Sequence, residues 1–319
     1  MPRTTISRDR ALRLALAPLL ATAVRMPAFA QTPKPLRVAA TANDTFAEAY
    51  YAQDAGMFRS AGLNVELATF TNGQQVATAV TTGTTDIGVS NPVSVIQAVQ
   101  HDVPLVCVAA AAQYASDVPG TALFVARDAP FRTAKDLEGR TVALGSLKDL
   151  STAGVAAWFG ASGIDMASAV KVVEVPFSEM GAALARGTVQ AASIPEPYQS
   201  AAKPEIRLLA NYFDVLAVKR FMLCMWVATP TFVEQNRELA RRFARSIYAT
   251  AKWANSRHAE SAAILAKYSH IDVAVINAMS RAVYAESLVP AELQPVADLA
   301  YKYKLIAAPF KAVDLMAKL

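Results

Sequence analysis

The sequence predicts an α/β fold of two lobes, each a mainly parallel sheet flanked by helices. Two observations lead to this prediction. A helix, a glycine and a short apolar strand follow one another at residues 72–92, around Gly83, and the same order returns at residues 181–197, around Gly187. The 319 residues also suffice for about two domains, at roughly 150 residues each. Because open parallel sheets bind ligands at the carboxyl ends of their strands, two such lobes would share a cleft.

The first 30 residues are typical of a secretory signal peptide. Four arginines precede an apolar segment at residues 14–24, and Ala28-Phe29-Ala30 supplies the small-any-small pattern of a cleavage site. We therefore predict export through the general secretory route, a mature chain beginning at Gln31 and a periplasmic location. No cysteine stands at the cleavage point, which argues against a lipid anchor.

Most of the net positive charge of the chain comes from residues 1–30. Residues 1–30 carry five Arg and one Asp, so the formal net charge falls from +5 to +1 when they are removed. Nucleic-acid and acidic-membrane binding need a clustered basic face and are excluded on this ground. The mean hydropathy of +0.25 is high, but no apolar run approaches the roughly 18 residues that span a membrane.

Lobe one is predicted to begin with residues 31–120, where polar side chains follow the strands. Asn43 and Asp44 come directly after the first strand, and Gln74 stands at the start of the helix in the first helix-glycine-strand unit. The remaining polar strand ends in this part are Ser90, Asn91 and Gln113.

Lobe two is predicted to span residues 121–217. Ser146 follows its strand at residues 141–144, and Ser151, beside Thr152, can cap the next helix, whose free amides would point back toward the strand end. Glu196 stands between two prolines that fix its backbone, at the end of the second helix-glycine-strand unit.

The chain is expected to return to lobe one for residues 218–319. The two crossings that form the hinge are predicted at residues 116–120 and 223–228. After Pro230 the periodicity predicts only helices, among them residues 273–287, which would cover lobe one.

Two kinds of side chain leave alternatives open. Cys107 and Cys224 lie in apolar runs and look like small buried hydrophobes, and export allows a disulfide without indicating one. Phe46, Trp158 and Trp226 are expected in the core, although one ring at the cleft is compatible with the pattern.

Four segments in this order resemble the periplasmic solute-binding proteins of ABC importers, in the branch that serves nitrate, sulfonates, taurine, bicarbonate and pyrimidine precursors of thiamine. They are residues 55–67 (AGMFRSAGLNVEL), 82–88 (TGTTDIG), 136–143 (DLEGRTVA) and 194–198 (IPEPY). The resemblance implies the type II periplasmic-binding fold with a two-strand hinge, a membrane permease as partner, no cofactor, and a monomer that binds a small polar or anionic organic solute, either sulfonate- or taurine-like or pyrimidine-like. By matched position, it implies ligand contacts from Asn43, Asp44, Gln74, Ser90, Asn91, Gln113, Ser146, Ser151, Thr152 and Glu196.

Each of these residues also has a structural interpretation. Ser90 and Asn91 can simply turn the chain before Pro92, and Ser151 and Thr152 can act as helix caps. Glu196 can be a solvated loop carboxylate. If Glu196 and Asp44 do face the ligand, they favour a molecule with an amine, amide or ring N–H, since an unpaired carboxylate against buried negative charge is costly.

Other function classes receive less support from the sequence. The three histidines do not cluster with carboxylates or cysteines, so a metal site is not expected. A nucleophile elbow, a phosphate loop and a dinucleotide fingerprint are all absent. The alternatives are a periplasmic sensor that docks on a receptor and, less favoured, an enzyme of the pyrimidine-synthase type on the same fold.

Overall fold

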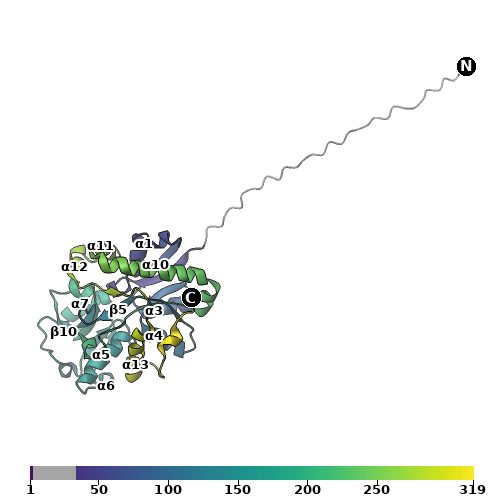
Figure 1. Ribbon diagram of the computed structural model, residues 1–319. Helices are drawn as coiled ribbons and strands as arrows, with labels where there is room; N and C mark the ends of the chain where they lie inside the picture. The colour runs from purple at the N-terminus through teal and green to yellow at the C-terminus, as the bar shows by residue number, and fades with distance from the viewer. Residues whose placement is uncertain (3–33) are drawn as a thin grey trace. The chain divides into compact units, whose positions relative to one another are not determined.

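The computed structural model describes residues 1–2 and 34–319, and the architecture is that of residues 34–319 (Figure 1). The predicted signal peptide falls almost entirely within residues 3–33, outside the described residues. No helix among the described residues has the length and apolar character needed to cross a membrane.

Three sheets organise the chain, and the two larger ones form two lobes. The first has the order β2-β1-β3-β12-β4, the second β10-β6-β9-β7-β8, and the third β11-β5-β13. The strands are β1 (Leu36–Thr41), β2 (Val65–Phe70), β3 (Ile87–Ser90), β4 (Val106–Ala110), β5 (Ala112–Ala115), β6 (Thr121–Ala126), β7 (Thr141–Leu144), β8 (Lys171–Glu174), β9 (Ala191–Pro195), β10 (Ile206–Ala210), β11 (Arg220–Met222), β12 (Met225–Ala228) and β13 (Val283–Tyr284).

The two large sheets repeat one pattern. In the first, β1 lies between β2 and β3 and is parallel to both, while β12 runs antiparallel beside β3. In the second, β7 lies between β8 and β9 and is parallel to both, while β6 runs antiparallel beside β9. The two helix-glycine-strand units therefore occupy equivalent places, since they supply β3 and β9. Both glycines that end their helices, Gly83 and Gly187, have a left-handed φ of about 70°.

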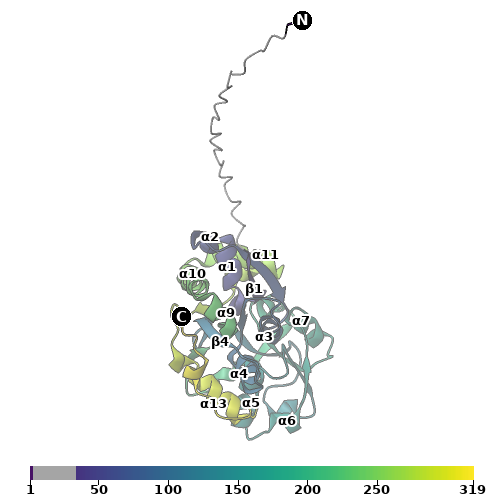
Figure 2. The ribbon, with the colours of Figure 1, turned by 90° about the vertical axis from the view of Figure 1, so that its right-hand side faces the viewer.

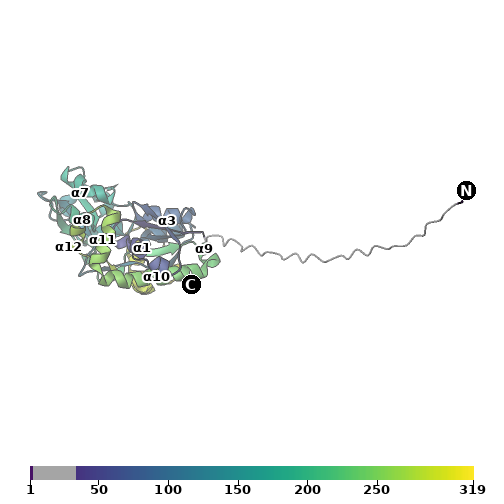
Figure 3. The ribbon, with the colours of Figure 1, turned by 90° about the horizontal axis from the view of Figure 1, so that it is seen from above.

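Helices cover these sheets. They are α1 (Glu48–Asp54), α2 (Met57–Ser60), α3 (Gly73–Thr81), α4 (Pro92–Gln100), α5 (Leu150–Ala161), α6 (Met166–Ala169), α7 (Phe177–Ala185), α8 (Tyr198–Ala201), α9 (Pro230–Gln235), α10 (Arg237–Ser256), α11 (His258–Ser269), α12 (Val273–Ala278) and α13 (Gln294–Lys302). The long helix α10 packs on α1 in lobe one, and α7 and α8 lie at the far end of the molecule in lobe two (Figure 3). Near the C-terminus, α13 contacts both α4 and α5 and so touches both lobes (Figure 2).

The connection between the lobes differs in detail from the prediction. The apolar run at residues 105–112 is divided between β4, in the first sheet, and β5, which pairs with β11 in the third. The predicted crossing at residues 223–228 is one element too late, because β12 is fully buried between β3 and β4. Along the chain, the preceding strand β11 lies between β10 of the second sheet and β12 of the first, so we assign the second crossing to it.

The C-terminal part is not entirely helical. The helix predicted at residues 273–287 ends at Ala278, and Val283–Tyr284 form β13 against β5. Arg281 and Tyr284 turn inward here to reach the loop after β1, which an uninterrupted helix would not allow.

Helix α5 packs against aromatic residues at Gly154, which gives a test of the packing. A Cβ atom at Gly154 would lie 2.4 Å from Cε1 of Phe213 and 2.6 Å from Cδ2 of Tyr212. Overpacking costs about 1–3 kcal/mol, which exceeds the roughly 0.5–1 kcal/mol that alanine gains over glycine within a helix. We therefore expect Gly154→Ala to lower the free energy of unfolding, measured by urea denaturation. Gly120→Ala is the control, because its Cβ would meet only Thr45 Cγ2 at 3.7 Å; equal stability of the two variants would contradict this packing.

Candidate functional site

A cavity of about 70 Å³ lies where the strand ends of the two lobes meet. It is lined from lobe one and its connecting segment by Asn43, Thr45, Phe46, Asn72, Gly73, Asn91, Leu223 and Cys224, and from lobe two by Thr121, Asp149, Leu150, Ser151, Phe177, Ser193, Pro195, Tyr212 and Phe213. The lining is polar at the strand ends and aromatic between them, which is the composition of a site for a small organic molecule.

Lobe one contributes asparagines that cap its helices. Asn72 follows β2, and its side-chain oxygen accepts from Gln75 N–H at 2.9 Å. Asn91 follows β3 and accepts in the same way from Ser94 N–H at 3.0 Å. These bonds satisfy helix amides that would otherwise lack partners and hold the two side chains at the cavity wall.

Lobe two contributes an acidic cap. Asp149 stands before α5, and three hydrogen bonds reach its Oδ1 atom: from Ser151 Oγ at 2.6 Å, from Thr152 N at 3.0 Å and from Thr152 Oγ1 at 3.2 Å. Deeper in the lobe, the Tyr212 hydroxyl lies 2.9 Å from Ser193 Oγ. Asp149, two residues before the predicted Ser151, is therefore the residue that caps this helix.

Among the lining residues of the described chain, Asp149 is the one with a carboxyl side chain, and lysine, arginine and histidine are absent. Burial raises the pKa of Asp149, and the hydrogen bonds from Ser151 and Thr152 oppose that rise. Burial also raises the pKa of Tyr212 to about 12 and that of the Cys224 thiol well above its ordinary value, so both stay neutral near pH 7. The cavity therefore offers a carboxyl group and no basic side chain.

Two aromatic rings from opposite lobes lie against glycines of the cavity region. A Cβ atom on Gly73 would be 3.0 Å from the ring of Phe46, and one on Gly145 would be 2.2 Å from the ring of Phe177. Only glycine permits this approach of ring to backbone. Phe46 is therefore the cleft ring among the three aromatic candidates, since Trp158 and Trp226 do not line the cavity.

The lobes touch directly at the cavity rim. Asn72 Nδ2 donates to the carbonyl of Gly145 at 3.1 Å, and Ser146 Oγ donates to Gln74 Oε1 at 2.5 Å. On another side, Tyr198 OH donates to the carbonyl of Ala42 at 2.9 Å. These contacts join the two lobes beside the cavity, and they exist only while the lobes lie together.

Of the ten predicted ligand contacts, three line the cavity: Asn43, Asn91 and Ser151. Gln74 and Ser146 lie instead at the rim, where they bond to each other. The other five do not line it, and each has a structural partner.

Three of those five have hydrogen-bond partners within the fold. Ser90 donates to the carbonyl of Gly73 at 2.6 Å and so fixes the start of α3. Gln113 bonds to the Glu292 carboxylate. Thr152 donates to the carbonyl of Ser146 at 3.2 Å and completes the α5 cap. Their hydrogen-bonding groups serve the fold.

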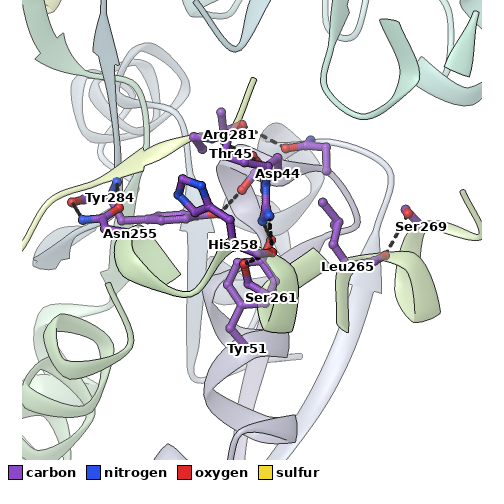
Figure 4. A network of polar contacts seen from close by, with 12 residues as sticks. Asp44, Thr45, Tyr51, Asn255, His258, Ser261, Leu265, Ser269, Arg281 and Tyr284 are labelled. Atoms are coloured by element: carbon purple, nitrogen blue, oxygen red, sulfur yellow. Dashed lines mark hydrogen bonds and ion pairs between the residues drawn. The ribbon is translucent and has the colours of Figure 1, made fainter. Parts of the chain in front are cut away.

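Asp44 is part of a buried ion pair rather than a free carboxylate (Figure 4). Arg281 Nη2 lies 3.0 Å from Asp44 Oδ1, and the Tyr51 hydroxyl donates to the same oxygen at 2.9 Å. The Ala282 N–H donates to Oδ2 at 2.6 Å, and Tyr284 donates its hydroxyl to the backbone carbonyl of Asp44. Asp44 therefore anchors the loop that carries Asn43 and Thr45 into the cavity.

Glu196 faces away from the cavity. Its Oε1 accepts from Ser200 Oγ at 2.8 Å, and it lines a separate surface hollow with Arg127, Lys203 and Arg207. Its backbone does serve the cleft, because its carbonyl accepts from Asp44 N–H at 3.0 Å across the lobes.

Sequence reasoning missed several lining residues, above all Asp149, Asn72 and Tyr212. The first two stand directly before helices and after strands, so their position as caps was a usable signal. No comparable pattern pointed to Tyr212, because it belongs to a short 3₁₀ helix, Tyr212–Val215, that packs against α5.

Neither cysteine forms a disulfide. Cys107 is buried in β4, and Cys224 lies at the cavity. Within residues 34–319 there is also no group of three or more His, Cys, Asp or Glu side chains placed to hold a metal ion.

Comparison with known protein families shows which family the sequence matches. The model of the family described as NMT1/THI5 like matches residues 43–261, about two thirds of the chain. The chain belongs to the NMT1/THI5-like family. No curated protein sequence gives a match.

Solved structures share the fold of this family member. The aliphatic sulphonate binding protein SsuA of Escherichia coli has 20% identity and a TM-score of 0.70, over 90% of this chain and 93% of that one. The alkanesulfonate-binding protein SsuA of Xanthomonas axonopodis pv. citri, bound to MOPS, has 18% sequence identity and a TM-score of 0.75, over 89% of this chain and 98% of that one. The periplasmic nitrate-binding protein NrtA of Synechocystis PCC 6803 has 13% sequence identity and a TM-score of 0.74, over 89% of this chain and 86% of that one. The predicted two-lobed periplasmic-binding fold is thereby confirmed.

Proposed function

We propose that this chain is the periplasmic solute-binding component of an ABC importer, a monomer that closes its two lobes around a small polar organic solute and presents it to a membrane permease. The observation that carries the proposal is the cavity between the lobes, which is lined by polar side chains from strand ends in both of them. The family assignment and the fold shared with periplasmic sulfonate- and nitrate-binding proteins support it.

The chain acts by binding and not by catalysis. The thiol of Cys224 is the strongest nucleophile that the cavity offers, but burial raises its pKa and keeps it protonated. No histidine stands among the lining residues of the described chain to activate it.

A thermal-shift panel of sulfonates, amino-sulfonates, aromatic carboxylates, nitrate, amines, amidines and pyrimidines tests the proposal. A solute at 100 times its dissociation constant adds about 2.7 kcal/mol to the free energy of unfolding, which raises the Tm of a protein this size by several degrees. We expect at least one small organic solute to do so, with one-to-one binding by calorimetry. No shift from any member of the panel would contradict a solute-binding role.

The contacts at the rim predict how an opened variant behaves. Asn72→Asp keeps the helix cap but loses the donors to Gly145 and to Glu174 Oε1, and it adds a negative charge beside Glu174. Two lost hydrogen bonds at roughly 0.5–1.5 kcal/mol each favour the open form by about tenfold. Cys224 should then react with a thiol reagent about ten times faster than in the unchanged protein. Asn64→Asp, on the surface, is the control, and an unchanged Cys224 rate in Asn72→Asp would contradict the role given to Asn72.

A further inference from the structure

The cavity contains one carboxylate oxygen without a partner. All three well-formed hydrogen bonds to Asp149 reach its Oδ1 atom. Within residues 34–319 no hydrogen bond reaches Oδ2, although Asp149 lines the cavity. Asp149 is only partly buried, so Oδ2 is left open to accept a hydrogen bond from a group on a bound molecule.

The helix start in lobe two that would bind an anion is already occupied by a carboxyl group of the protein. The start of α5 would attract an oxyanion, but Asp149 itself accepts from the amide of Thr152 there. Lysine, arginine and histidine are absent from the cavity lining of the described chain. At the rim, Asn72 also bonds to Glu174, which brings a second carboxylate close to the cavity. A sulfonate or nitrate would therefore meet negative charge without a cation.

The opposite wall offers a donor and aromatic surface. Asn43 is almost fully buried, and its oxygen accepts from Thr45 Oγ1 at 2.9 Å, while its amide nitrogen donates to no residue of the described chain. The rings of Phe46 and Phe177 supply faces that attract a cation or stack on a flat group.

We infer that the solute is an organic cation, such as an amine or amidine on a small apolar or aromatic body, and that Asp149 is the residue that selects it. Its N–H groups would bind Asp149 Oδ2 in lobe two, and an acceptor atom on it would meet the Asn43 amide in lobe one, so one molecule joins both lobes. The inference rests on the proposed function and replaces the predicted sulfonate-like class.

Two matched sets of probes separate charge from shape. Benzamidine, benzamide and benzoate share one skeleton with positive, neutral and negative groups, and acetamidine, acetamide and acetate form a smaller set. Titration calorimetry and thermal shift of the full mature protein are measured with each. We expect the cation of at least one set to bind tightest, the amide more weakly, and neither anion to bind measurably.

The variant Asp149→Asn tests the assigned residue. Asparagine caps a helix as well as aspartate, so the cap is kept while the charge is removed. We expect amidine affinity to fall about 10- to 100-fold, as for loss of a charge-assisted hydrogen bond, and the amide probe to lose little. Asp272→Asn is the matched control, since Asp272 caps α12 far from the cavity by accepting from Ala274 N–H at 2.7 Å; its amidine affinity should not change.

The outcomes distinguish the two levels of the proposal. Equal or tighter binding of benzoate or acetate than of the amidines by the unchanged protein overturns the inference and leaves the solute-binding function standing. Unchanged amidine affinity in Asp149→Asn also overturns it. No binding of any probe, here or in the wider panel, overturns the proposed function and the inference together. The comparison of probes on the unchanged protein needs no variant to fold.

Discussion

The Arg281→Met variant is expected to lose about 3–5 kcal/mol of the free energy of unfolding, the largest effect of any single substitution considered for this protein. Arg281 and Asp44 are both buried, with side chains 7% and 1% exposed. Burial alone would lower the pKa of Arg281, but the charge of Asp44 raises it overall. Removing the guanidinium leaves the Asp44 carboxylate buried with only the Tyr51 hydroxyl and one backbone amide as partners.

Urea denaturation of three variants and of the unchanged protein measures this effect. The double variant Asp44→Asn with Arg281→Met should recover part of the loss, because no unpaired charge remains. Arg257→Met is the matched control, since its pair with Glu260 is exposed and contributes about 0–1 kcal/mol. A loss in Arg281→Met no greater than in Arg257→Met would show that the buried pair does not hold the Asp44 loop.

The second large effect is a change in how stability depends on pH. Glu48 is 1% exposed on α1; its Oε2 accepts from Trp226 Nε1 at 2.9 Å, and its Oε1 has no partner among the described residues. Burial raises the pKa of Glu48 well above 4.5, and the bond from Trp226 opposes this only in part. The native state therefore keeps a proton that the unfolded chain releases above about pH 4.5.

The sign of the effect follows from that proton. Between the unfolded and folded pKa values the native state binds more protons, so the free energy of unfolding falls as pH rises, by about 1.4 kcal/mol per pH unit from this group. Glu48→Gln cannot titrate but keeps an acceptor for Trp226. We therefore expect the free energy of unfolding of the variant to rise relative to that of the unchanged protein as the pH increases above about 4.5, until the pH reaches the raised pKa of Glu48 in the native state.

Paired urea denaturations at several pH values test this expectation. The quantity of interest is the difference in the free energy of unfolding between variant and unchanged protein at each pH, which cancels the other titrating groups. Glu234→Gln, at an exposed position on α9, should show a constant difference. A difference for Glu48→Gln that stays constant over the same range would mean that Glu48 ionises normally in the native state.

Sequence reasoning found the parts of the fold that depend on local pattern. The two helix-glycine-strand units were readable because each glycine ends a helix in a left-handed conformation and a short apolar strand follows. Polar residues after strands led to Asn43 and Asn91, because the strand ends of both sheets meet at the cavity. Each of these patterns is local, because the residues that make up any one of them lie within about ten positions of one another in the sequence.

The rest depends on contacts between distant parts of the chain. Asp44 follows the same strand as Asn43, and only Arg281, 237 positions away, shows that its carboxylate serves the fold. The α5 cap depended on where the helix begins: the pattern placed its start after Thr152, and the structure begins it at Leu150, which makes Asp149 the cap. Because of that shift of a few residues, the prediction named Glu196 and Asp44 as the carboxylates of the site and did not include Asp149, which lines the cavity.

The most direct test of the central claim, that a solute is held in the cavity between the lobes, is the rate of Cys224 modification at increasing concentrations of the solute that binds best. Cys224 lines the cavity, and Cys107, buried in β4, serves as the internal reference. The account predicts that the Cys224 rate falls as the site fills, with its midpoint at the calorimetric dissociation constant. An undiminished Cys224 rate at saturating solute would place the binding site elsewhere and contradict the account.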